Sequence, residues 1–182
     1  MDTKAKRRLA ETVRRHFSRR IQQWGFARTK ATFWTRSLEC TVQFVHLHLF
    51  TYGPRFRVHF GIRVLNDTFP APALNGLSSY DGWALASRKY VFAFSSSPDT
   101  ATTCADELAA FVSEVGVPWF ESFATPDVLL VPDGPLGHEA MLRLRLALEG
   151  QPDPVAIAAS RKMLGIQVST SGPGTKRYGE QH

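Results

Sequence analysis

Apolar residues recur every three or four positions along the first 24 residues, which is the spacing of one face of an α-helix. This apolar stripe consists of Ala10, Val13, Phe17, Ile21 and Trp24. Most arginines of the segment fall on the opposite side. Gly25 follows directly and tolerates the positive φ of a residue that ends a helix. The sequence therefore predicts an amphipathic helix that ends near residue 24.

After this helix the apolar spacing changes to every second residue, which is typical of β-strands. The pattern predicts a short strand at residues 32–36, a longer one at residues 40–50 and a turn at residues 51–54. The next strand has an apolar side made of Phe56, Val58, Phe60, Ile62 and Val64. Its other side carries Arg55, Arg57, His59 and Arg63. We expect an antiparallel meander with one face on the core and the other against water, a ligand or a partner.

The second half of the chain has helical patterns between connections rich in Pro and Gly. Residues 66–82 form a long loop, which we interpret as a candidate binding loop or flap. Residues 89–94 predict one more strand. Helices are expected from Pro98 to a stop at Gly116, from Thr125 to about Val131, at residues 138–149 and at residues 153–164.

This order of elements predicts an α+β fold. We expect an N-terminal helix, an antiparallel β-meander covered on one face by helices, and a C-terminal helical extension. The predicted organisation is an α+β domain over residues 1–134, a helical pair packed on it over residues 135–165, and a flexible tail over residues 166–182.

Charge is distributed very unevenly along the chain. The net charge is +6, yet residues 1–36 hold eleven Lys or Arg and two acids, a local balance of +9. Subtracting +9 from +6 leaves −3 for the remaining residues. The basic character therefore belongs to the first helix and its surroundings, and it does not describe the whole fold.

Cysteine content and hydropathy limit the cellular setting. Cys40 and Cys104 fit no zinc or redox spacing, so we interpret both as small buried residues. No apolar run approaches the length of a membrane span, and the charged start lacks the pattern of a signal peptide. We expect a cytoplasmic protein.

Several short runs resemble domain-of-unknown-function family 4304, whose members are bacterial proteins. They are Trp24-Gly25-Phe26, Phe33-Trp34, the strand from Phe56 to Ile62, and the segment from Gly116 to Glu121. The resemblance covers about residues 8–130. It implies a fold without a settled activity. By analogy with families of similar size, it suggests a toxin-neutralising, immunity-type role.

The polar face of the predicted sheet is the first candidate site. Arginine and histidine side chains on one sheet face recognise phosphate or carboxylate groups well. A solvated outer face is the common alternative. The candidate residues for an anion or an acidic protein partner are Arg55, Arg57, His59, Arg63, His46 and His48.

Two alternatives use other chemistry. The basic helix predicts a nucleic-acid-binding face made of Arg7, Arg8, Arg14, Arg15 and Arg19. His46, His48 and His59 could in principle bind a metal in an enzyme, but cationic neighbours and the lack of a nearby acid disfavour it. No metal or other cofactor is expected.

Catalytic motifs are absent from the sequence. There is no nucleophile elbow, P-loop or dinucleotide fingerprint, and His138-Glu139 is not completed by a second histidine because position 142 is Leu. We therefore expect a non-catalytic binding protein, and the resemblance to family 4304 implies a bacterial one.

Overall fold

The computed structural model describes residues 1–80 and 85–167. It begins with a long helix, as the periodicity predicts, and continues into a four-stranded sheet, three strands of which the periodicity predicts. The elements of this half are α1 (Thr3–Ile21), the 3-10 turn η1 (Gln22–Trp24), β1 (Ala27–Lys30), β2 (Phe33–Ser37), β3 (Thr41–Leu49) and β4 (Phe56–Val64).

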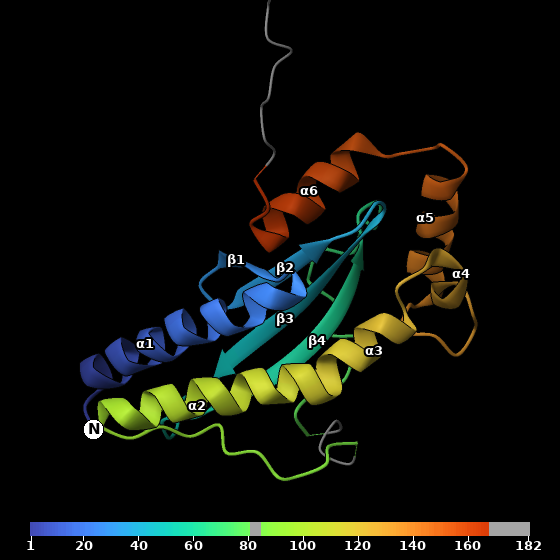
Figure 1. Cartoon of the computed structure of the whole chain (residues 1–182). Helices are drawn as coiled ribbons and strands as arrows, with labels where there is room; N and C mark the ends of the chain where they lie inside the picture. Colours follow the sequence, from blue (N-terminus) through green and yellow to red (C-terminus); the bar gives the residue numbers. More distant parts are fainter. Residues whose placement is uncertain (81–84, 168–182) are drawn as a thin grey trace, which may run out of the picture.

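Helices make up the second half, which confirms the α+β class (Figure 1). They are α2 (Pro98–Phe111), the π-helical turn η3 (Val112–Gly116), α3 (Val117–Ser122), α4 (Pro126–Leu129), α5 (His138–Leu148) and α6 (Pro154–Leu164). The predicted tail lies, from residue 168 onward, outside the described residues.

Helix α1 buries the predicted stripe. Ala10, Val13, Phe17 and Ile21 are fully buried, and Gly25 ends the turn after the helix with a φ of 80°. At the other end, the carboxylate of Asp2 accepts a hydrogen bond from the Ala5 amide at 2.7 Å and caps the helix. No helix in the described ranges combines the length and the apolar character that a membrane crossing needs.

The sheet is an antiparallel meander in the order β1-β2-β3-β4, as predicted. Sequence reasoning missed β1, because its Ala-Arg-Thr-Lys sequence shows no apolar alternation. The register places Trp34 beside Val45 and Val45 beside Phe60. These three side chains therefore form one cross-strand row on the core face.

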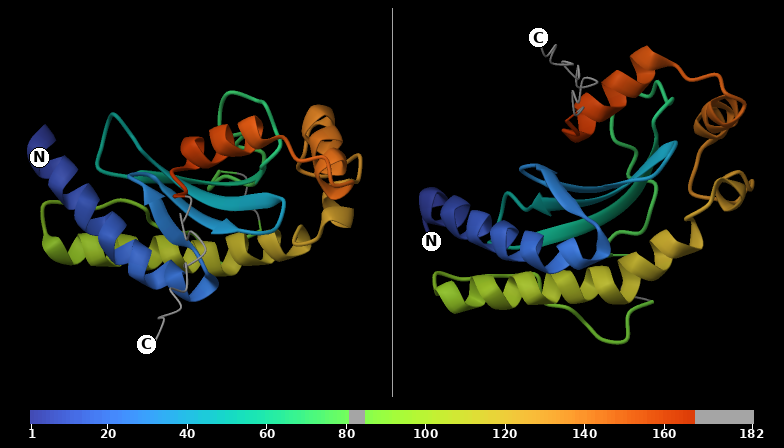
Figure 2. Two further views of the ribbon diagram at one scale, coloured as in Figure 1. Left: turned by 90° about the horizontal axis from the view of Figure 1, so that it is seen from above. Right: turned by 45° about the horizontal axis from the view of Figure 1, so that its top comes forward.

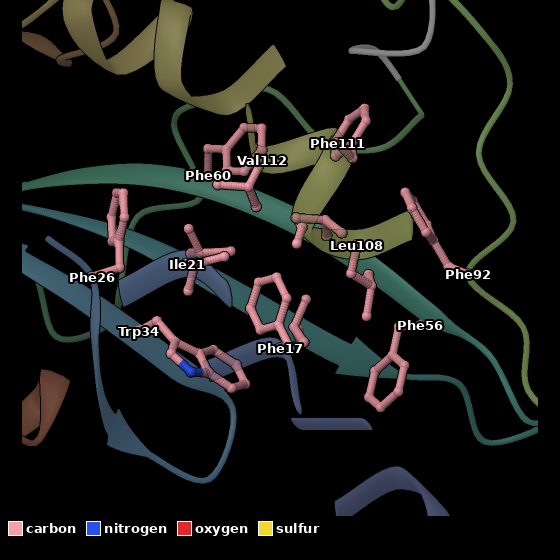
Figure 3. Packing of buried hydrophobic residues seen from close by; sticks show 14 of the residues in the cluster. Phe17, Ile21, Phe26, Trp34, Phe56, Phe60, Phe92, Leu108, Phe111 and Val112 are labelled. Carbon is pink, nitrogen blue, oxygen red and sulfur yellow. The ribbon is translucent and has the colours of Figure 1, made fainter. Parts of the chain in front are cut away.

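Helices α1 and α2 cover this core face of the sheet (Figures 1 and 2). The core between them is rich in aromatic rings, several of which Figure 3 shows at close range. Phe17 of α1 meets Trp34 of β2 edge to face at 4.9 Å, and the Trp34 indole donates to the Ser18 hydroxyl at 2.8 Å. The alternation in β4 thus decided correctly which side chains enter the core.

Helix α6 lies over part of the opposite sheet face, so the sheet is covered on more than the one face we expected (Figure 2). A second, smaller apolar cluster joins Val42 and Phe44 of β3 to Leu65 and to Leu164 of α6. The rest of this face, toward the β3–β4 hairpin, carries the candidate residues described below.

The outer edge of β4 is covered by two loop segments. The predicted strand at residues 89–94 is wrong, because this segment makes only an isolated bridge between Ala93 and Arg55. The loop at residues 66–82, predicted as a binding loop or flap, hydrogen-bonds to β4: Phe60 donates to Leu77 and Ser79 donates to Val58, each at 2.9 Å. Residues 81 and 82 lie outside the described residues. Both segments protect an otherwise open strand edge.

The helix that begins at Pro98 does not stop at Gly116. The chain passes through the π-helical turn η3 and continues as α3 to Ser122 (Figure 1). Pro118 has no amide hydrogen to donate, and the wider turn before it keeps the chain helical in spite of this. The predicted stop was wrong because Gly116 serves close packing: a Cβ there would lie 2.6 Å from the Phe60 ring.

Candidate functional site

The open part of the outer sheet face carries a row of stacked rings. The register aligns Phe33, His46 and His59 on three neighbouring strands. The His46 ring stacks on Phe33 at 4.5 Å between centroids and on His59 at 5.9 Å. His48, two residues along the same strand, is exposed and packs edge to face on Phe50 at 5.8 Å. The predicted histidines are therefore neighbours on one face.

These histidines do not form a metal site. The ring centroids of His46 and His48 are 6.5 Å apart, and the rings of His46 and His59 lie nearly parallel, with 24° between their planes. Among the residues that the structure describes, no three His, Cys, Asp or Glu side chains are grouped so as to hold a metal ion.

Burial lowers the pKa of His46 from its usual 6.5 to about 4, with further contributions from His59 and His48. A folded-state pKa below the unfolded value means that the unfolded chain takes up this proton first as the pH falls. The stability contributed by neutral His46 is therefore fully present above pH 6.5 and is lost as the pH falls toward 4.

We predict that His46→Gln flattens the pH dependence of stability between pH 7 and pH 4.5. The wild-type protein should lose about 1–3 kcal/mol more than the variant over this range. Urea unfolding at several pH values measures the difference. His138→Gln, at the exposed start of α5, is the control and should follow the wild-type curve. Parallel curves of stability against pH for wild type and His46→Gln would contradict the lowered pKa of His46.

Arg55 and Arg57 lie beside this row at the start of β4. The Arg57 guanidinium lies over the Phe50 ring at 5.3 Å and over the Tyr80 ring at 4.8 Å, and Arg55 lies over Phe50 at 4.7 Å. Arg57 Nε is buried and has no hydrogen-bond partner among the described residues. Neither arginine forms an ion pair within the described part of the chain. The rings position both guanidinium groups, and no side-chain or main-chain oxygen in the described ranges accepts a hydrogen bond from them.

A pocket of about 370 Å³ opens between these arginines and the segment at residues 89–93. We call it the cationic–aromatic pocket. It is lined by three cations and by aromatic rings, and no described acid takes part in its lining. The residues that matter here are Arg55, Arg57, Lys89, Phe50, Tyr80 and Tyr90. Arg88 next to it is different, because it pairs with Glu107 at 2.8 Å.

Arg63 does not belong to this open surface. It faces the predicted side of β4, but it is only 1% exposed beneath the loop after β4 and α6. Its guanidinium pairs with Asp67 at 3.1 Å, and its Nε donates to the Ser160 hydroxyl at 3.0 Å. The alternation of apolar and polar residues in β4 predicted the correct sheet face for Arg63. Residues far along the chain cover this part of the face.

The predicted nucleic-acid face is also only partly open. Arg7, Arg8, Arg15 and Arg19 are exposed on α1. Arg14 instead lies over the Phe56 ring at 5.4 Å and within 3.6 Å of Glu11. Its burial lowers the pKa of its guanidinium, and Glu11 opposes this effect.

Sequence reasoning did not single out Phe50, Lys89 or Tyr90, and it included Tyr80 only within the candidate binding loop at residues 66–82. Phe50 could have been found from its place opposite Arg55 at the hairpin. Lys89 and Tyr90 come from a segment that meets β4 only in the folded chain, and no local pattern indicates them. No protein family model, curated protein or solved structure matches this chain.

Proposed function

We propose that this chain is a non-catalytic binding protein that recognises an acidic segment of a partner protein at the cationic–aromatic pocket. The observation that supports the proposal best is the state of Arg55 and Arg57. Both are held against aromatic rings, and neither has an acidic partner among the described residues.

A carboxylate is the group that suits such arginines. The planar guanidinium presents parallel N–H donors that match the two oxygens of a carboxylate. Stacking on Phe50 and Tyr80 restricts the side chains before binding, which reduces the entropy lost when a ligand is held. Lys89 adds a third positive charge to the lining.

A protein partner is favoured over a small ligand by the rim of the pocket. Tyr80 is 68% exposed and Val91 is 61% exposed, so apolar surface continues outward from the opening. Small-molecule sites usually enclose most of their ligand, whereas Arg and Tyr beside open apolar surface are typical of protein interfaces. The bacterial, immunity-type version of this role rests on the resemblance to family 4304 and on analogy.

The proposal can be tested with three twelve-residue peptides. One repeats Glu-Glu-Tyr-Gly, the second repeats Gln-Gln-Tyr-Gly, and the third repeats Glu-Glu-Ser-Gly. Calorimetry should detect the first peptide most strongly, because it alone offers both carboxylates and rings. Arg57→Gln should weaken its binding about 10- to 100-fold, since a hydrogen bond to a charged group contributes about 1.5–3 kcal/mol.

Arg145→Gln is the matched control, because it removes the same charge from an exposed position on α5. It should leave the affinity for the first peptide unchanged. Equal binding of the Glu and Gln peptides, or equal loss in Arg57→Gln and Arg145→Gln, would reject recognition at the pocket.

A further inference from the structure

The outer side of α1 carries a straight row of cations: Lys4, Arg8, Arg15 and Arg19, all exposed. The spacings of four, seven and four residues bring them to one face of the helix. From Lys4 to Arg19 the row extends about 22 Å along the axis at 1.5 Å per residue. It lies opposite the buried stripe, on the side of the helix turned away from the sheet.

Several other cations near α1 pair with acids of the fold, whereas these four do not. Arg14 pairs with Glu11, Arg20 pairs with Asp106 of α2, and Arg28 of β1 pairs with Glu11. No described acid pairs with a member of the outer row. Like charges four residues apart slightly destabilise a helix. The row therefore does not stabilise the helix, and fold stability does not explain why these four cations lie on one face.

A second group of cations lies beyond β1, which runs between α1 and α6 (Figures 1 and 2). A groove of about 620 Å³ separates the end of β1 from the last turns of α6. Lys30, Arg161 and Lys162 line this groove, and no described acid does. The groove beside β1 is thus positive, as the outer side of α1 is.

A polyanion without apolar anchors fits this surface better than a membrane or an acidic protein. The apolar residues of α1 are buried, and none of the helix's large apolar side chains is exposed, so nothing is available for insertion into lipid. The row also lacks the aromatic side chains that form the centre of protein interfaces or stack on single-stranded bases. A row of exposed cations without apolar or aromatic anchors suits the phosphates of a duplex.

We infer that α1, together with the groove between β1 and α6, binds the phosphate backbone of double-stranded nucleic acid without reading its sequence. This activity is separate from the proposed peptide recognition, because the two use different residues. Of the face that the sequence predicted, Arg14 is not part of this surface and Arg7 lies outside the row, whereas Lys4, Lys30, Arg161 and Lys162 are added.

The test measures binding of two unrelated 24-base-pair DNA duplexes by fluorescence anisotropy at a series of salt concentrations. The wild-type protein should bind both with equal affinity and with a steep salt dependence. Arg8→Gln/Arg15→Gln/Arg19→Gln should weaken binding of both duplexes at least tenfold and reduce the log–log salt slope by about 2–3. Lys30→Gln/Lys162→Gln should reduce the slope by a further 1–2.

Arg55→Gln/Arg57→Gln/Lys89→Gln is the matched control, because it removes three charges from the cationic–aromatic pocket, and it should bind DNA as the wild type does. All substituted positions on α1 are exposed, and circular dichroism checks that the helix content is kept. Undetectable duplex binding at 50 mM salt, or full binding by the α1 variant, would overturn the inference. Tighter binding to single strands or to phosphatidylserine vesicles than to duplexes would also overturn it.

Discussion

Replacing Arg63 with leucine should lower the free energy of unfolding by about 3–5 kcal/mol, because the change leaves a buried carboxylate without its partner. The Arg63 guanidinium pairs with Asp67 and donates to the main-chain oxygens of Asp67 at 2.6 Å and Phe69 at 2.9 Å. It also donates to Ser160 of α6. The side chain therefore joins β4, the following loop and α6. Urea unfolding followed by circular dichroism measures the loss.

Two variants show whether the unpaired charge is the cause. Arg63→Leu/Asp67→Asn removes the carboxylate as well and should be more stable than Arg63→Leu alone by at least about 1 kcal/mol. Arg57→Leu, on the same strand and face but partly exposed, should lose less than about 1 kcal/mol. An Arg63→Leu protein as stable as Arg57→Leu would contradict the burial and pairing described for Arg63.

Replacing Phe60 with alanine should cost about 3–5 kcal/mol of stability, which is the usual loss for removing a large ring from a packed core. Phe60 is fully buried at the centre of β4 (Figure 3). Its ring centroid lies 5.7 Å from that of Phe111, 6.4 Å from that of Trp119 and 5.5 Å from that of Phe120. The loss has two causes. The free energy gained by transferring the ring from water into the core is lost, and a cavity is left between sheet and helices.

Phe60→Leu should lose clearly less than Phe60→Ala in the same urea experiment, because leucine fills part of the volume. Tyr52→Ala, which removes an aromatic ring that is 88% exposed in the β3–β4 turn, should change stability by less than about 0.5 kcal/mol. Similar losses for Phe60→Ala and Tyr52→Ala would mean that Phe60 is not in the core.

Much of the fold could be predicted because it depends on the spacing of apolar residues along short stretches of the chain. The stripe from Ala10 to Ile21 and the alternation from Phe56 to Val64 both enter the core as expected. The short turns between strands also made the antiparallel order predictable. Helix ends were predicted well where a glycine adopts positive φ, as at Gly25 and Gly165. Gly116 was misread because its role is close packing on a ring from β4.

What could not be predicted depends on contacts between distant residues. Arg63 and Arg57 have the same alternation, and the positions of α6 and of the loop after β4 distinguish them. The segment at residues 89–94 has strand-like composition, yet it reaches β4 only near Ala93. Likewise, Lys89 and Tyr90 join Arg55 and Arg57 in a pocket although more than thirty residues separate them in sequence.

An NMR titration of the protein with the Glu-Glu-Tyr-Gly repeat peptide, observing backbone amides and arginine Nε groups, shows whether the acidic peptide binds at the cationic–aromatic pocket. We expect the largest shifts at Arg55, Arg57, Tyr80 and Lys89, and in Arg57→Gln the shifts at Arg55, Tyr80 and Lys89 should require about 10- to 100-fold more peptide. Shifts confined to α1, or the same shifts with the Gln-Gln-Tyr-Gly peptide, would contradict this expectation.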